Sequence, residues 1–159
     1  MFQIGVIGAG KAEEEEYHIA EQVGEEIAKA GHVLVCGGLG GVMEAAAKGA
    51  RSQGGLTVGI LPGEIKEEAN EYIDVRVVTA MSHARNAIIT RTADVLITVG
   101  GGAGTLSEVA LALKIGKPVV MVKDVLPGFA LEMESVYLVS SPKEAVELAQ
   151  NLGKKEVSV

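Results

Sequence analysis

The sequence has one cysteine, few aromatic residues and no tryptophan. Because Cys36 is the only cysteine among 159 residues, no disulfide can form within the chain. Aromatic residues make up 3% of the chain and hydrophobic residues 48%. We therefore expect a core of Val, Ile, Leu, Ala and Met, which is typical of a parallel β-sheet covered by helices.

Basic residues are outnumbered, and long apolar runs are missing. The net charge of −7 disfavours nucleic acid or a membrane surface as a partner, because phosphate groups attract clustered Lys and Arg. No apolar run approaches the roughly 18 residues that span a bilayer, and residues 1–10 lack the basic start of a signal peptide. No residue set has the spacing of a metal site. We therefore expect a cytoplasmic protein with neither a membrane span nor a metal centre.

Short apolar segments alternate with helical patterns along the chain. We expect strands at residues 3–8, 33–37, 57–61, 74–78, 95–100, 119–123 and 136–140, and helices at residues 13–30, 42–52, 82–92, 105–115 and 142–151. This alternation predicts a doubly wound, mostly parallel, Rossmann-like α/β fold with helices on both faces of the sheet. Residues 1–159 form one predicted domain, with a flexible tail at residues 153–159. The charged segment 62–73 is either a lid or, more simply, a solvated loop or short surface helix.

Three glycine-rich loops follow predicted strands, at residues 8–11, 37–41 and 100–105. In an open α/β sheet such loops lie at the carboxyl ends of strands, where helix N-termini direct spare N–H groups at an anion. The third loop is the strongest candidate, because its glycines and Thr105 let the backbone approach a phosphate oxygen closely. One glycine would suffice for a tight turn, so this loop predicts ligand binding.

The first loop departs from two known phosphate motifs. Glu13 stands where the dinucleotide fingerprint has its third glycine, which disfavours a nicotinamide cofactor. Ala12 stands where a Walker loop has its metal-binding hydroxyl. The acidic residues 13–16 complement the dipole of the first helix but would repel a phosphate. We therefore expect the anion at the other two loops.

Two charged residues are candidates for chemistry near these loops. An arginine such as Arg85, reaching over the strand ends, can clamp a phosphate or a ribose hydroxyl. Glu108, if held close to Arg85, would stay ionised and could act as a base or stabilise positive charge on a sugar. The alternatives are that Arg85 is a surface residue and that Glu108 compensates a helix dipole.

Three segments together resemble the LOG-type proteins, a family once labelled "possible lysine decarboxylases". Residues 100–108, GGGAGTLSE, resemble the family's PGGxGTxxE signature. Residues 81–85, MSHAR, resemble its M-x-x-R-K element, and residues 37–43, GGLGGVM, are similar to its GGGxxGLM loop. The segments occur in the family's order, and the likeness spans residues 4–122.

The resemblance implies a modified Rossmann domain that forms a homo-oligomer, a dimer or tetramer. It also implies cleavage of the N-glycosidic bond of a nucleoside 5′-monophosphate, which gives free base and ribose 5-phosphate without an organic cofactor. Arg85 and Glu108 then take the catalytic positions. The expected ligand-binding residues, from the loops and the resemblance together, are Gly8, Gly10, Gly37, Gly38, Gly41, Met43, Met81, Arg85, Gly101, Gly102, Gly104 and Thr105.

Two departures from the family signature keep other functions open. Gly100 replaces its proline, and Asn86 replaces the lysine beside the arginine. Backbone amides can still bind a ligand, so the alternative is a non-catalytic carrier or binder. Its ligand would be molybdenum cofactor, a phosphate-bearing pterin bound by a related branch, or another phosphate-bearing, nucleotide-like molecule. A third hypothesis is an interaction module in which the glycines serve only turns.

Other residues have simpler explanations. The helix at residues 105–115 is apolar on more than one face, which favours an oligomer. Met43 and Met81 either line a base pocket or fill the core, and Cys36 is expected to be a small buried hydrophobe. His83 either faces the site or caps a helix.

Overall fold

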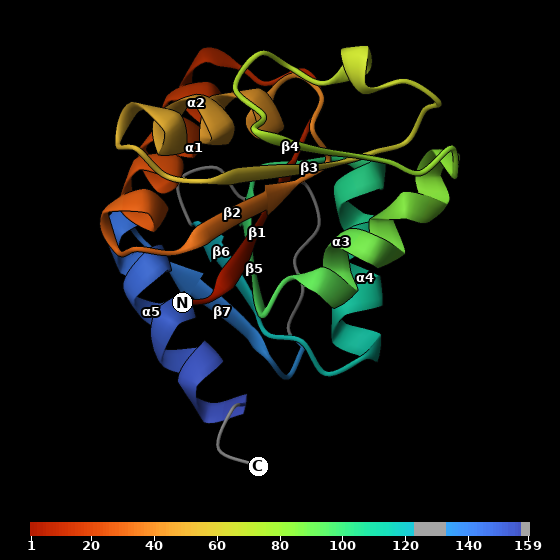
Figure 1. Cartoon of the computed structure of the whole chain (residues 1–159). Helices are drawn as coiled ribbons and strands as arrows, with labels where there is room; N and C mark the ends of the chain where they lie inside the picture. Colours follow the sequence, from red (N-terminus) through yellow and green to blue (C-terminus); the bar gives the residue numbers. More distant parts are fainter. Residues whose placement is uncertain (123–132, 157–159) are drawn as a thin grey trace.

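The computed structural model describes residues 1–122 and 133–156, which form a sheet between two layers of helices (Figure 1). Within these residues the sheet has seven strands in the order β4-β3-β2-β1-β5-β6-β7. Every pairing is parallel, which confirms the predicted α/β fold. The strands are β1 (Gln3–Gly8), β2 (Val33–Cys36), β3 (Thr57–Leu61), β4 (Val75–Val78), β5 (Val95–Val99), β6 (Val119–Val122) and β7 (Val136–Val139).

The helices cover both faces of the sheet, with α1, α2 and α5 on one face and α3 and α4 on the other (Figure 1). Strand side chains alternate between the faces, so Val6 and Leu34 pack in the first layer whereas Ile7 and Val35 pack in the second. The helices are α1 (Glu14–Lys29), α2 (Val42–Ser52), α3 (Asn86–Thr92), α4 (Ala103–Lys114) and α5 (Pro142–Glu156), with short 3-10 helices η1 (Lys66–Glu68) and η2 (Ser82–Arg85).

Local signals in the sequence set several boundaries. All five residues of β5 are buried, as expected of a central strand covered on both faces. Gly31 after α1 and Gly116 after α4 have positive φ angles of 75° and 77°, which suit glycine at a helix end. At the start of α5, the Ser141 hydroxyl accepts a hydrogen bond from the Glu144 N–H at 3.2 Å.

The expected boundaries at the start of α3 and at the end of α5 differ from the structure. The helix expected at residues 82–92 begins as a 3-10 turn, whose first residue, Ser82, has a φ of 52°. Its N–H donates to the Pro62 carbonyl at 2.9 Å, so a bond to a distant loop fixes this turn. Residues 153–156 continue α5 and are not the start of a tail. Residues 123 and 157–159 lie outside the described residues.

Helices α1 and α2 cross at two glycines. A Cβ atom on Gly24 would overlap the carbonyl oxygen of Ala46, and one on Gly49 would overlap the carbonyl oxygen of Glu21. Both glycines have ordinary helical positions within their helices. The contact therefore needs glycine for close backbone approach and not for an unusual φ angle.

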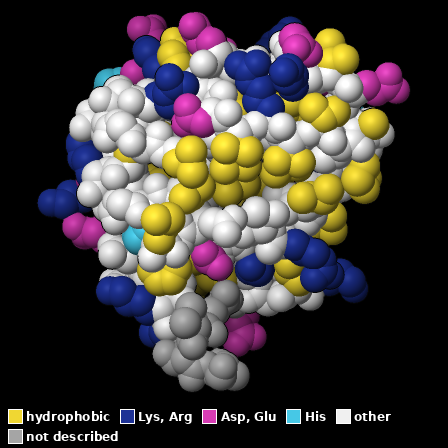
Figure 2. Space-filling view, viewed as in Figure 1, with side chains coloured by type: hydrophobic (Ala, Val, Ile, Leu, Met, Phe, Trp, Pro, Cys, Tyr) yellow, Lys and Arg dark blue, Asp and Glu magenta, His cyan; other side chains and the backbone are white. Residues whose placement is uncertain are grey.

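The edge strand β4 is exposed, and hydrophobic side chains gather near it. Figure 2 shows them as a band across the face where Figure 1 places β3, β4 and the start of α3. Val75, Val77 and Val78 of β4 are 45%, 38% and 43% exposed, and Met81 is 48% exposed. An unprotected apolar edge strand is a surface on which other chains can pair.

The order of the strands in the sheet determines where a ligand site can lie. The chain runs outward from β1 to β4, returns to β5 beside β1, and continues to β7. The loops after β1 and β5 therefore diverge and leave a crevice at the carboxyl ends of these strands.

Candidate functional site

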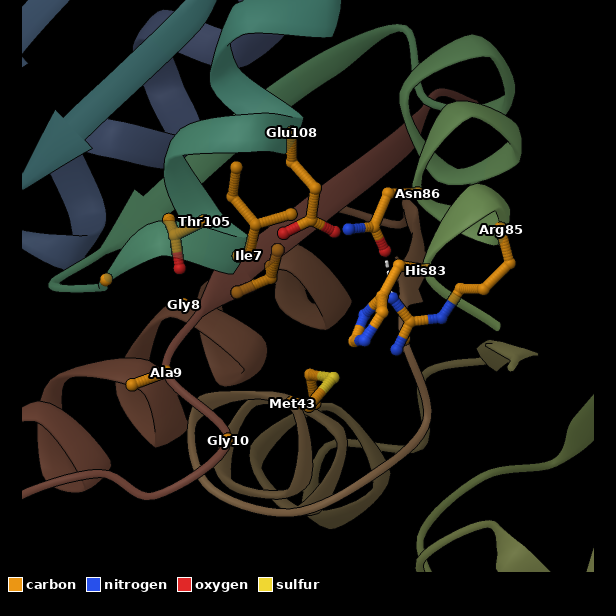
Figure 3. A pocket seen from close by; sticks show the side chains of 14 residues that line it. Ile7, Gly8, Ala9, Gly10, Met43, His83, Arg85, Asn86, Thr105 and Glu108 are labelled. Atoms are coloured by element: carbon orange, nitrogen blue, oxygen red, sulfur yellow. Dashed lines mark hydrogen bonds between the residues drawn. The ribbon is translucent and has the colours of Figure 1, made fainter. Parts of the chain in front are cut away.

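A cavity of about 350 Å³ lies at this crevice (Figure 3). Its walls come from the strand ends, the three glycine loops, η2 and the starts of α3 and α4. This volume lies within the range of sites for small molecules. The lining residues are Val6, Ile7, Gly8, Ala9, Gly10, Gly37, Met43, His83, Arg85, Asn86, Gly102, Gly104, Thr105 and Glu108.

The third glycine loop enters α4 through an unusual backbone path. Gly100 and Gly101 have φ angles of 57° and 132°, and a Cβ atom on Gly101 would lie 2.6 Å from the Thr105 side chain. The helix begins at Ala103, two residues earlier than expected. Its first turn leaves backbone N–H groups without partners inside the helix, next to the lining residues Gly102 and Thr105. These groups and the helix dipole suit an anion.

Gly100 explains one departure from the LOG-type signature. Proline is confined to φ near −65°, so it cannot adopt the φ of 57° found here. A side chain at this position would also overlap the carboxylate of Glu16, which extends from the first turn of α1. The acidic run was expected to direct an anion away from the first loop, but Glu16 lies beside the third loop.

Thr105 and Glu108 share one face of α4, because residues three apart in a helix lie on the same side. Both side chains extend from α4 toward the cavity (Figure 3), although they are only 3% and 7% exposed. Burial raises the pKa of Glu108 to about 7, and the nearby Arg85 only partly offsets this shift. The expectation that Arg85 would keep Glu108 ionised is therefore wrong, because desolvation is the larger effect.

Arg85 is buried at the end of η2 and is not the surface residue of the alternative hypothesis. Its Nη1 donates to the Asn86 side-chain oxygen. Within the described part of the chain its buried Nε has no hydrogen-bond partner. Burial lowers the pKa of Arg85, and Glu108 opposes this shift. The structure thus brings Arg85 and Glu108 to one cavity, with an arginine donor available to a ligand.

The second glycine loop leaves space for the Arg85 side chain, because Gly37 has no side chain of its own. A Cβ atom on Gly37 would lie 2.7 Å from Nη2 of Arg85 and 2.6 Å from the sulfur of Met43. Gly38 and Gly41 have φ angles of 77° and 66° and do not line the cavity. A Cβ atom on Gly41 would overlap the Ala9 carbonyl oxygen, so these two glycines shape the loop.

The segment considered as a lid is fastened to the second loop. The Asn70 side-chain amide donates to the Leu39 carbonyl at 2.8 Å and to the Gly38 carbonyl at 3.3 Å. Its backbone N–H donates to the same Gly38 carbonyl at 2.9 Å. The segment contains the exposed helix η1, so the simpler expectation of a surface helix fits it.

The structure separates the expected ligand-binding residues into two groups. Eight of them line the cavity, as does Glu108 of the catalytic pair; the eight are Gly8, Gly10, Gly37, Met43, Arg85, Gly102, Gly104 and Thr105. Gly38, Gly41, Gly101 and Met81 do not line it. Met81 instead lines a shallow hollow with Ala84 and Ile88 on the outer side of α3.

Several lining residues were not among the expected binding residues. Val6, Ile7 and Ala9 belong to the end of β1 and its loop, and their position before Gly10 was a usable signal. His83 lines the cavity, which agrees with one of its two expected roles. In the sequence, Asn86 differs from its neighbours only as a departure from the signature, because its contact with Arg85 depends on the folded turn.

Residues 1–122 and 133–156 offer neither a metal site nor a membrane-spanning helix, and their one cysteine is buried. These residues contain no group of three or more His, Cys, Asp and Glu side chains that could hold a metal ion. None of their helices is long and apolar enough to cross a bilayer. Cys36 is buried beside the site, and burial raises the pKa of its thiol to about 12. Its burial is as expected, and the raised pKa leaves the thiol protonated and unreactive at neutral pH.

Two proteins illustrate the range of related sequences. The chain is 56% identical over 146 residues to an uncharacterised protein of Archaeoglobus fulgidus. The match covers 92% of this chain and 93% of that protein. It is 40% identical over 114 residues to the cytokinin riboside 5′-monophosphate phosphoribohydrolase of Mycobacterium tuberculosis. That match covers 65% of this chain and 60% of the mycobacterial protein, so the chain matches well under two thirds of the enzyme's length.

A solved structure matches nearly the whole chain. The molybdenum cofactor binding protein of the phototrophic bacterium Rippkaea orientalis has a TM-score of 0.86 and 40% identity. The match covers 94% of this chain and 96% of that protein. With the phosphoribohydrolase match, it confirms the resemblance to LOG-type proteins and their carrier relatives. The profile of the SLOG cluster4 family matches residues 1–153, and the chain therefore belongs to the SLOG cluster4 family.

Proposed function

We propose that the chain binds a phosphate-bearing ligand of nucleotide size in this cavity and hydrolyses the N-glycosidic bond of a nucleoside 5′-monophosphate. The observation that carries the proposal is Glu108, a buried carboxyl group in the cavity with a pKa of about 7. A carboxyl group that titrates near neutral pH suits proton transfer, and strongly shifted groups gather at active sites. The similarity to the mycobacterial phosphoribohydrolase supports the same reaction.

The phosphate belongs at the start of α4. There the N–H groups of the first turn and the Thr105 hydroxyl can surround its oxygens, and the helix dipole favours its charge. Residues 8–10 form the opposite wall (Figure 3). The rest of the ligand then extends toward Met43, His83 and Arg85.

In the proposed reaction, the Glu108 carboxylate accepts a proton from a water molecule as the water oxygen bonds to C1′ of the ribose. The bond between C1′ and the base breaks, and its electron pair leaves with the base. The base takes a proton from solvent, so the products are free base and ribose 5-phosphate. Arg85 orients the substrate, and its charge also favours the ionised form of Glu108. The proposal includes no organic cofactor.

A second candidate is a non-catalytic carrier of molybdenum cofactor. The molybdenum cofactor binding protein of Rippkaea orientalis matches almost the full chain, whereas the mycobacterial enzyme matches 65% of it. The same anion site would hold the phosphate of the pterin, since backbone N–H groups do not depend on the signature residues. In this alternative, Arg85 and Glu108 bind the cargo without turnover.

The proposal also includes a cytoplasmic homo-oligomer, a dimer or tetramer, with no nucleic-acid partner. The outer side of α4 supports self-association, because Leu106 is 38% exposed there. Leu106, Ala110 and Leu113 line a shallow hollow of about 260 Å³. Apolar surface of this kind is typical of subunit contacts. Size-exclusion chromatography with light scattering tests the oligomer.

Base release from a panel of nucleoside 5′-monophosphates tests the main proposal. Chromatography should detect free base with wild-type protein and none with Glu108→Gln, while calorimetry shows that the variant still binds AMP. Gly101→Ala should weaken AMP binding, because its Cβ atom would meet Thr105.

The outcomes separate the hypotheses. No base release under conditions where AMP or phosphate binds would eliminate the hydrolase. A pterin found by mass spectrometry on the purified protein would then support the carrier. If phosphate, nucleotides and pterins all fail to raise the melting temperature, the interaction module is favoured, since a ligand of the native state must stabilise it.

A further inference from the structure

Asn86 connects two walls of the cavity through hydrogen bonds. Its side chain is 5% exposed, and its carbonyl oxygen accepts a hydrogen bond from Nη1 of Arg85. Its Nδ2 donates to the Ser107 hydroxyl at 3.3 Å, and that hydroxyl donates to the Gly104 carbonyl at 2.7 Å. The amide therefore links Arg85, at the end of η2, to the first turn of α4.

Arg85 has a carboxyl group nearby, that of Glu108, with which it does not pair. Within the described residues, no ion pair of 4.0 Å or less joins Arg85 to Glu108. In Figure 3 the Asn86 side chain lies between the carboxyl group of Glu108 and the guanidinium group of Arg85. The guanidinium group lies against Gly37, where only a glycine leaves room for it. A buried arginine and carboxyl group would ordinarily be expected to pair.

We propose that Asn86 is a positioning residue that holds the Arg85 guanidinium group against Gly37 and prevents it from pairing with Glu108. This inference rests on the proposed function, in which both charged side chains act on a ligand in the cavity. An Arg85 that does not pair with Glu108 has donors left for the ligand, and its Nε has no protein partner among the described residues. Glu108, without a paired cation, keeps its proton up to neutral pH.

The residue type matters for this role. An asparagine side chain offers an acceptor to the guanidinium group and a donor to Ser107 at the same time. A lysine, which the LOG-type signature has at this position, has no acceptor and adds a positive charge. In this chain Asn86 thus keeps Arg85 and Glu108 apart through hydrogen bonds to Arg85 and Ser107, which a lysine could not form in the same way.

NMR of isotope-labelled protein without ligand tests the proposal directly. In wild-type protein the two terminal nitrogens of Arg85 should give separate signals, because a held guanidinium group rotates slowly. Asn86→Leu removes the acceptor at similar size, so the two signals should merge. The pKa of Glu108 should then fall by about 1 to 3 units as Arg85 becomes able to pair with it. Asn86→Asp keeps the acceptor, so the signals should stay separate, while its negative charge raises the pKa of Glu108.

Other groups near Glu108 must be controlled in this titration. The charged or titratable groups that face it are Arg85 and His83 from η2 and Cys36 from β2. The thiol stays neutral because its pKa is about 12. A His83→Gln background removes the imidazole. Asn151→Leu, at an exposed position in α5, is the matched control and should leave both measurements unchanged.

The opposite pKa changes of the two Asn86 variants distinguish positioning from a general structural role. If Asn86→Leu does not fold, Ser107→Ala removes the second anchor of the amide and should broaden or merge the Arg85 signals. The proposal is overturned if a folded Asn86→Leu or Ser107→Ala protein keeps separate signals. An unchanged Glu108 pKa in folded Asn86→Leu overturns it as well. Base release from AMP is measured separately, so a protein that cleaves nothing refutes the hydrolase and leaves this comparison intact.

Discussion

Glu108→Gln is expected to stabilise the protein above neutral pH and to have little effect in acid. Burial raises the pKa of Glu108 from its ordinary 4.5 to about 7. Each pKa unit corresponds to roughly 1.4 kcal/mol, so ionising the folded protein costs about 3 kcal/mol relative to the unfolded chain. Near pH 4 the carboxyl group is protonated in both states, and glutamine is then equivalent. Stability from this group therefore falls progressively as pH rises above 4.5 and is fully lost once pH has risen through 7, and glutamine avoids that loss.

Thermal unfolding followed by circular dichroism measures this effect. For a chain of this size, about 3 kcal/mol corresponds to roughly 6 to 12 °C in melting temperature. The variant should exceed wild type by this amount at about pH 8 and match it at about pH 4. Glu147→Gln is the control, because Glu147 is 64% exposed and its 4.0 Å contact with Lys143 is worth little. A difference between Glu108→Gln and wild type that does not vary with pH would refute the reasoning.

Two substitutions at glycines test the backbone. Gly100→Pro restores the signature proline but should destabilise the protein by about 2 kcal/mol or more in urea unfolding, because proline cannot adopt a φ of 57°. An unchanged urea midpoint would mean that the loop takes another path. Gly24→Ala should cost about 1 to 3 kcal/mol, because its Cβ atom would overlap the Ala46 carbonyl oxygen. Hydrogen exchange in α1 and α2 should then accelerate, and exchange at the wild-type rate would contradict a tight crossing.

The fold was predictable because its signals are local. The ranges 3–8 and 57–61, read from apolar runs that end in turn residues, are the bounds of β1 and β3. The turn at Ser82 was not predictable, since it depends on a hydrogen bond to Pro62 twenty residues earlier in the chain. Long-range bonds of this kind leave no periodic pattern in the sequence.

Most of the expected site residues do line the cavity, although Gly38, Gly41, Gly101 and Met81 do not, and the charge state of the site was not predictable. Arg85 and Glu108 come to one cavity because both lie at the carboxyl end of the sheet, which the strand order already implies. The protonation of Glu108 depends on how much water the neighbouring elements exclude. The degree of burial cannot be read from the sequence. Reasoning from the proximity of Arg85 alone therefore predicted a lowered pKa for Glu108, whereas burial raises it.

The crossing of α1 and α2 affects how a ligand can enter. Each of these helices directly follows a glycine loop, and their close contact at Gly24 and Gly49 couples the two loops mechanically. The two loops also touch directly, since the Val42 N–H donates to the Ala9 carbonyl at 3.0 Å, and close-packed backbones of this kind resist sliding. A ligand therefore meets this half of its site already assembled, and little conformational entropy is lost there on binding.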